Sequence, residues 1–234
     1  MNAVEQLVRA AAEGDEERVA RLLGEGVPVD AGNTKYRTAL DVAVWAQRTN
    51  VIRLLLAAGA DPEQSIGEYS EDTPLRCAAA RGMEEVVSLL LDADAMPDYR
   101  LHPSRATPLM LAATENHTEI VRLLLDHGAD LELEGRGKTA LEWAAWSGRP
   151  EVLQLLLDRG AVCTAEALEC AVREAVLRRQ SLPPERLAEY ELTVSILLNT
   201  PNRVVSPRRS GHHSHVMSAS FPEAGGAGQV PGGQ

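Results

Sequence analysis

The chain of 234 residues contains few of the residue types that several fold classes depend on. Aromatic residues make up 3% of it, so a helical core of Leu, Val and Ala is favoured over a sheet sandwich rich in Phe and Tyr. The cysteines Cys77, Cys163 and Cys170 are odd in number and scattered, which favours reduced thiols over a disulfide framework. No apolar run approaches the roughly 20 residues that span a bilayer, and the N-terminal segment lacks a signal-peptide pattern.

Positive charge is also scarce. The formal net charge is −11 and the pI is about 5.1. Binding nucleic acid or an anionic membrane surface through general electrostatics needs a basic face, so we expect neither partner. With 44% hydrophobic and 24% charged residues, the composition fits a soluble globular or solenoid protein, which we expect to be cytoplasmic.

A leucine-rich segment recurs along the chain. Residues 51–61 read VIRLLLAAGAD, residues 120–130 read IVRLLLDHGAD, and residues 152–161 read VLQLLLDRGA. Looser copies occupy residues 86–95 and 19–27, and the last leucine of successive copies lies at 23, 56, 91, 125 and 157. A period between 20 and 50 residues is typical of repeat architectures.

A second motif precedes each of the four later copies. It begins at Thr38, Thr73, Thr107 and Thr139 and reads TALDVA, TPLRCA, TPLMLA and TALEWA. Threonine caps a helix start and proline is tolerated in the first turn, and the Leu and Ala positions share one helical face. Glycine suits the backbone where a helix ends. We expect it to end the first helices at 82 and 148 and the second helices at 26, 59, 128 and 160.

With these motifs the sequence resembles the ankyrin-repeat family, over about residues 3–200. The resemblance implies an all-α ankyrin-repeat solenoid of about five to six helix-turn-helix units with short hairpin loops. It also implies a non-catalytic protein–protein interaction module whose partner docks on the concave face. We therefore expect no enzymatic activity, no catalytic residues, no metal site and no cofactor.

Two departures from the family pattern give further expectations. The usual histidine after Thr-Pro-Leu is replaced by Asp41, Arg76, Met110 and Glu142, so we expect a common hydrogen-bond network between repeats to be absent. The third repeat ends Asp-Ala-Met from Asp94 rather than Gly-Ala-Asp, so we expect a distorted turn there.

The motifs divide the chain into an ankyrin-repeat domain over residues 1–199 and a tail over residues 200–234. The domain comprises an N-terminal cap with a polar outer face (1–30), repeats at 31–63, 64–98, 99–131 and 132–162, and a modified C-terminal cap repeat (163–199). In that last repeat we expect a helix over 164–179, a loop over 180–184 and a longer helix over 186–199. The tail is rich in Pro, Gly, Ser and His and is predicted to be disordered. Its charge is about +2, whereas the repeats carry 20 basic and 33 acidic residues.

The family resemblance places the partner-binding residues just before each Thr-x-Leu motif and at the end of each first helix. They are Thr34, Lys35, Arg37 and Trp45 in the second unit, Tyr69, Ser70, Asp72 and Arg81 in the third, Pro103, Ser104, Thr114 and Glu115 in the fourth, and Arg136, Lys138, Trp146 and Ser147 in the fifth.

This surface collects two of the three tryptophans, both lysines and several arginines of an acidic chain. Such residues anchor interfaces, and their charge suits a protein partner with an acidic docking surface. Trp45 and Trp146 could instead cover neighbouring helices, and Trp143 is expected to face the core between repeats.

Other functions stay open. A metal-dependent regulator or enzyme could use the tail histidines His212, His213 and His215 or the insertion at residues 180–187. The chain could also be a self-associating scaffold, although we expect a monomer. We expect the three cysteines to pack in or beside the core rather than to react, and His117 to be structural.

Overall fold

The computed structural model describes residues 2–34, 37–64, 72–100 and 105–200. These residues form twelve helices and no strand, which confirms the predicted all-α solenoid. The helices are α1 (Ala3–Glu13), α2 (Glu16–Gly24), α3 (Ala39–Trp45), α4 (Thr49–Ala57), α5 (Pro74–Ala80), α6 (Glu84–Asp92), α7 (Pro108–Glu115), α8 (Thr118–Asp126), α9 (Ala140–Ser147), α10 (Pro150–Asp158), α11 (Ala165–Arg178) and α12 (Pro184–Asn199).

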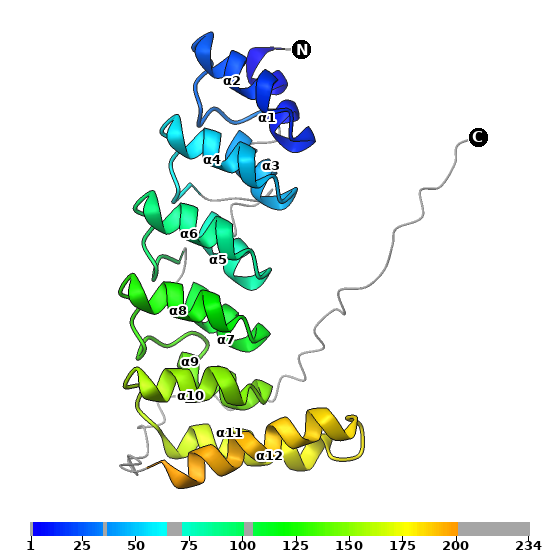
Figure 1. Cartoon of the computed structure of the whole chain (residues 1–234), viewed down its shortest axis with the longest axis vertical. Helices are drawn as coiled ribbons and strands as arrows, with labels where there is room; N and C mark the ends of the chain where they lie inside the picture. Colours follow the sequence, from blue (N-terminus) through cyan, green and yellow to red (C-terminus); the bar gives the residue numbers. More distant parts are fainter. Residues whose placement is uncertain (1, 35–36, 65–71, 101–104, 201–234) are drawn as a thin grey trace, which may run out of the picture.

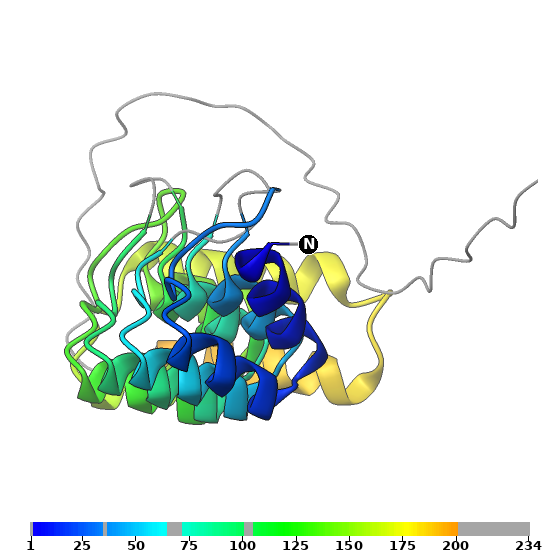
Figure 2. The same cartoon turned by 90° about the horizontal axis from the view of Figure 1, so that it is seen from above.

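The helices stack as antiparallel pairs into one elongated body (Figure 1). Seen along the stack, the first helices of the pairs form one layer and the second helices the other (Figure 2). The loops between consecutive pairs rise on the side of the first helices. One apolar cluster runs through the whole stack, from Leu7 in α1 to Leu197 in α12. Each pair therefore depends on its neighbours for part of its core.

The predicted helix starts are confirmed by their hydrogen bonds. The hydroxyl of each capping threonine accepts the N–H of the residue three positions later, at 3.2 to 3.4 Å. These caps are Thr38, Thr73, Thr107, Thr139 and Thr164. Each side chain satisfies a backbone donor that the helix itself leaves unpaired.

The predicted helix ends are confirmed as well, since the six glycines at these ends all have positive φ. The expected distortion at Asp94 is wrong. Asp94 itself adopts the left-handed conformation, with φ of 64°. The N–H of Ala95 then donates to Leu90 O at 3.0 Å, as that of Ala60 donates to Leu55 O. Aspartate tolerates this backbone region better than most residues do.

Two of the four residues that replace the usual histidine form hydrogen bonds of their own between repeats. Arg76 Nε donates to Ala106 O at 2.8 Å in the next repeat. The hydroxyl of Thr164 donates to Glu142 Oε1, also at 2.8 Å. The side chains of Arg76 and Glu142 are buried and long enough to cross the gap between repeats. They therefore form connections of their own in place of the histidine.

Arginines at the turn after the first helix make a second set of contacts between repeats. Arg48 donates to the carbonyl of Ala12 at 3.1 Å, Arg81 to that of Trp45 at 3.0 Å, and Arg149 to that of Thr114 at 2.8 Å. Each of these carbonyls lies at the C-terminal end of the first helix of the preceding repeat, where no intrahelical donor is available. A cation there also complements the helix dipole. His117 holds the corresponding position in the fourth repeat, and a Cβ on Gly82 would lie 2.6 Å from its ring. This contact supports the structural role expected of His117.

The last helix pair differs from the others in length. Helices α11 and α12 have 14 and 16 residues, against 7 to 11 in the other helices, and they extend beyond the rest of the stack (Figure 2). Helix α12 begins at Pro184, inside the predicted loop, because proline suits the first helical turn. Tyr190 of α12 is buried against Gly148, which holds it to α9. The repeat boundaries stay a prediction, and residues 201–234 lie outside the described part of the chain.

Candidate partner-binding surface

Eleven of the sixteen predicted partner-binding residues belong to the described part of the chain. Lys35, Tyr69, Ser70, Pro103 and Ser104 lie outside it. The described ones lie in two areas, one near Trp45 and one near Trp146, and the third repeat contributes residues to both.

The Trp45 area is held by local contacts. The Trp45 side chain is 48% exposed, and the guanidinium of Arg81 lies 5.4 Å from its ring centroid. Arg37 pairs with the Asp41 carboxylate at 2.8 and 3.1 Å, and the N–H of Thr34 donates to Glu5 at 2.9 Å. Trp45 is thus an exposed aromatic residue whose cationic neighbour is fixed by its bond to the Trp45 carbonyl.

The Trp146 area contains a partly open pocket of about 170 Å³, lined by residues of the third, fourth and fifth helix pairs and the loops before them. We call it the tryptophan–arginine pocket. Its lining residues are Arg76, Arg105, Ala106, Leu111, Thr114, Glu115, Arg136, Trp143 and Trp146. Four of these were predicted as partner-binding residues: Thr114, Glu115, Arg136 and Trp146. The fold brings them together from α7, α9 and the hairpin before α9.

Two tryptophans on α9 form the aromatic side of the pocket. Trp143 and Trp146 are three residues apart, on one face of the helix. Their ring centroids are 5.6 Å apart at 87°, an edge-to-face contact. Trp143 Nε1 donates to Gly135 O at 3.3 Å, and the guanidinium of Arg178 lies 5.6 Å from the Trp146 centroid. The long α11 thereby supplies a cation that holds one wall of the pocket in place.

A tight hairpin presents Arg136 at the pocket. Gly135 and Lys138 exchange backbone hydrogen bonds, and the two residues between them, Arg136 and Gly137, have φ of 55° and 72°. Positive φ at both positions is typical of a type I′ turn. Gly135 is required because a Cβ there would lie 2.7 to 2.8 Å from Met110 Sδ and the backbone of the preceding finger. The close approach sets the exposed Arg136 at the pocket edge.

Positive charge concentrates at the pocket. Three arginines line it, against one carboxylate, that of Glu115. Burial lowers the pKa of Arg76, the Asp72 carboxylate raises it, and the charges of Arg105 and Arg136 lower it further. Arginine nevertheless stays protonated in proteins. The Arg76 side chain is 7% exposed and donates to Asp72 at 2.8 Å, so one wall of the pocket is a fixed, buried cation.

Sequence reasoning missed part of this site and misplaced other residues. Trp143 packs against the apolar cluster, as expected, but it is only partly buried and also lines the pocket, which was not predicted. The spacing of three between the tryptophans was the available signal. Arg105 stands two residues before the Thr107 cap, where Pro103 and Ser104 were chosen instead. Ser147 is 7% exposed, so its assignment to the binding surface is wrong. It lies on the face of α9 that points away from solvent.

The cysteines lie buried in the described part of the chain. Cys77, Cys163 and Cys170 are unpaired and buried, as expected, and burial raises the pKa of Cys77. Within the described ranges no group of three His, Cys, Asp or Glu residues is placed to hold a metal ion. The tail histidines lie outside these ranges. No helix in the described part of the chain is both long and apolar enough to span a bilayer.

A comparison with known families decides what the repeats are. A family described as ankyrin repeats (3 copies) matches residues 7–101 and 78–167, which together cover more than half of the chain. The chain belongs to the ankyrin-repeat family. Ankyrin repeats are protein-interaction modules and are generally non-catalytic, so the coarse functional expectation is confirmed.

Relatives of this ankyrin-repeat protein are similar over limited segments. A putative ankyrin repeat-containing protein of Treponema pallidum is 37% identical over 90 residues, 38% of this chain and 29% of that protein. Ankyrin repeat and SOCS box protein 5 of Bos taurus is 43% identical over 70 residues, 30% of this chain and 20% of that protein. The inactive serine/threonine-protein kinase TEX14 of Bos taurus is 35% identical over 100 residues, 43% of this chain and 6% of that protein. The chain thus spans less than a third of the length of each.

Proposed function

We propose that this ankyrin-repeat protein is a non-catalytic module that binds an acidic protein partner across its first helices and the loops beside them. The tryptophan–arginine pocket is the anchor of that surface. The observation that carries the proposal is the convergence of two tryptophans and three arginines on one pocket of an acidic protein. Trp and Arg are enriched at the positions that dominate binding energy, since they combine large area with directed polar groups.

The charge distribution supports an acidic partner. The whole chain carries −11, so a cluster of three arginines runs against its average. A partner carboxylate near Arg136 would meet a positive local potential, while carboxylates elsewhere on the body repel it. This contrast would direct an acidic segment to the pocket and disfavour other orientations.

The pocket is also preorganised for binding. Trp143 is tied to the hairpin, Trp146 is packed between Trp143 and Arg178, and Arg76 is fixed by two hydrogen bonds. Little side-chain freedom is left to lose on docking, which favours affinity. We further propose that the protein acts as a monomer in the cytoplasm, without nucleic-acid or membrane partners, consistent with its acidic charge and buried free thiols.

A peptide-library selection tests this function. The full chain should select peptides that place Asp or Glu beside an apolar residue. Arg136→Gln should weaken the selected peptides by about tenfold, the size expected for one anchor residue. Arg21→Gln on α2 is the matched control, because it removes the same charge from an exposed side chain at the other end of the stack.

The readout is peptide affinity by titration calorimetry, with circular dichroism to verify the fold of each variant. Selected peptides without acidic residues, or equal affinity for the wild type and the Arg136→Gln variant, would refute the proposed surface.

A further inference from the structure

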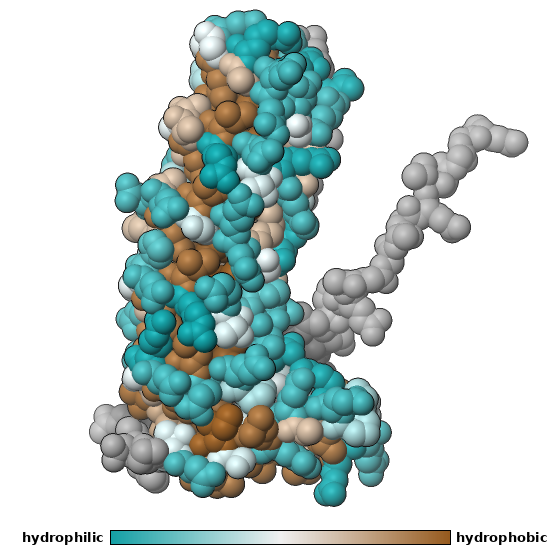
Figure 3. Space-filling view, viewed as in Figure 1, coloured by the Kyte–Doolittle hydropathy of each residue, from teal (hydrophilic) through white to brown (hydrophobic). Residues whose placement is uncertain are grey.

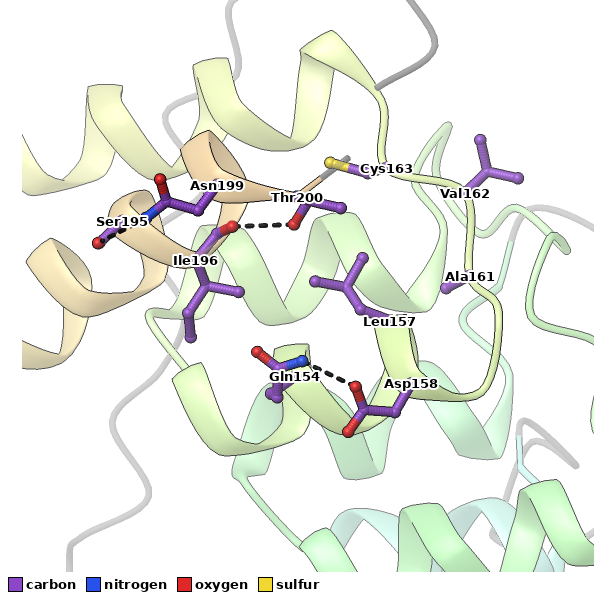
Figure 4. A pocket seen from close by; sticks show the side chains of 10 residues that line it. All are labelled: Gln154, Leu157, Asp158, Ala161, Val162, Cys163, Ser195, Ile196, Asn199 and Thr200. Atoms are coloured by element: carbon purple, nitrogen blue, oxygen red, sulfur yellow. Dashed lines mark hydrogen bonds between the residues drawn. The ribbon is translucent and has the colours of Figure 1, made fainter. Parts of the chain in front are cut away.

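A groove on the second-helix side of the stack lies between α10 and α12, far from the tryptophan–arginine pocket. It comprises two adjoining hollows of about 580 and 390 Å³. Gln154, Asp158 and Ile196 line both hollows, so the two adjoin each other beside α12 and form one open groove. We call it the C-terminal groove, and Figure 4 shows its larger half.

The floor of the C-terminal groove is apolar. Leu157 and Ile196 face it, and Val162 and Leu192 on its edges are 38% and 52% exposed. Six of the eight exposed large apolar side chains in the described part of the chain fall between Val162 and Leu198. Figure 3 shows apolar surface that runs along this face of the stack and reaches the last helix pair. A terminal repeat of a solenoid needs a polar outer face to stay soluble, so this surface calls for a cover.

The rim of the groove is mainly acidic. Asp158 and Glu151 are exposed at its edge, and Gln154 donates to Asp158 at 2.8 Å. The cation at this rim is Arg122, which lies 3.7 Å from Glu119 on its own helix. An occupant with apolar side chains flanked by positive charge fits such a groove.

The chain itself leaves the described body at this groove. Thr200 lines it and donates through Oγ1 to Ile196 O at 2.8 Å. The next nine residues read PNRVVSPRR and contain two adjacent valines, three arginines and no acidic residue. Nine extended residues reach roughly 30 Å, and 16 residues of α12 span about 24 Å. The segment is long enough to run along the whole groove.

We propose that residues 201–209 bind the C-terminal groove of their own chain. Val205 covers the apolar floor near Ile196 and Leu192, while Val204 lies on the opposite side of the extended segment. The arginines meet the acidic rim at Asp158 and Glu151. Tethering at Thr200 gives the segment an effective concentration in the millimolar range, so a weak contact suffices. The segment thereby completes the end of the solenoid, whatever partner the first helices bind.

Hydrogen exchange on the full chain tests the proposal. The double variant Val204→Asp/Val205→Asp should expose the groove and raise amide exchange over residues 192–200 by about tenfold, the effect of losing one good apolar contact. Val216→Asp/Val230→Asp is the matched control, because it adds the same charge to the same tail beyond the proposed segment. Equal exchange in the wild type and the first variant overturns the proposal.

A labelling experiment covers the case in which aspartates disturb folding. Val205→Cys should react with a thiol reagent about tenfold more slowly than Val216→Cys, because the groove shields it. The three native cysteines are buried and react little. Leu192→Asp should remove the difference. Equal labelling rates overturn the proposal, and so does shielding that disappears on dilution, since a second copy would then fill the groove.

Discussion

At the scale of single residues, the end of the third repeat differs from the others, because an aspartate instead of a glycine adopts the left-handed backbone conformation there. Gly26, Gly59, Gly128 and Gly160 adopt positive φ after the second helices without steric cost. Asp94 adopts φ of 64° at the equivalent place, and its own side chain crowds the backbone there. The hydrogen bonds around it match those of the other repeats, so the cost is local.

Replacing Asp94 by glycine should therefore stabilise the protein. We expect Asp94→Gly to raise the free energy of unfolding by up to about 1 kcal/mol, because relief of left-handed strain outweighs the added freedom of the unfolded chain. Gly59→Ala makes the opposite change at the corresponding turn and should destabilise by a similar amount. Urea unfolding of both variants measures the two changes in the free energy of unfolding. A loss of stability in Asp94→Gly would show that the carboxylate contributes more than the strain costs.

At the scale of elements, carboxylates connect the turn of one repeat to that of the next. In each case a carboxylate oxygen accepts a backbone N–H from 30 to 33 residues further along the chain, at 2.6 to 3.1 Å. The pairs are Asp30 with Asp61, Glu63 with Met96, Asp98 with Asp130, and Glu132 with Val162. These bonds fix the spacing of consecutive loops, and with it the spacing of the proposed binding surface.

Glu63 shows how such a contact responds to pH. Burial raises the pKa of Glu63, the N–H of Met96 lowers it, and the charge of Asp61 raises it. A carboxyl whose pKa is higher in the folded than in the unfolded chain adds stability at low pH, and that contribution is lost as the pH rises through the folded pKa.

Two substitutions separate the bond from the charge. Glu63→Ala should lower the free energy of unfolding by about 1 kcal/mol at neutral pH, the net value of one hydrogen bond. Glu63→Gln keeps an oxygen acceptor without the charge, so it should match or exceed the wild type there. On acidification to about pH 4 the free energy of unfolding of the wild type should rise relative to that of Glu63→Gln, because the Glu63 carboxyl then takes up a proton. Urea unfolding at both pH values measures this, and the opposite trend would contradict the burial argument.

At the scale of the whole molecule, the period and the caps were sufficient to predict the stacked helix pairs. Those features are local to each repeat, and they recur. The contacts between repeats were not predictable in the same way, because Arg76 and Glu142 bond to partners 22 to 30 residues away. The tryptophan–arginine pocket was not predictable for the same reason. Its residues come from three repeats, and only the stacking brings Trp143 beside Arg105.

The stack also determines how far a local defect spreads. Leu7 in α1 and Leu124 in α8 are both fully buried, so truncating either to alanine should cost roughly 2–5 kcal/mol locally. Each repeat contacts only its neighbours, so the end pair can unfold alone while a central pair cannot. Leu7→Ala should speed hydrogen exchange in α1 and α2 and leave the main urea transition nearly unchanged. Leu124→Ala should lower the midpoint of that transition. Exchange that rises evenly through α9 in Leu7→Ala would mean that the apolar cluster makes the repeats unfold as one unit.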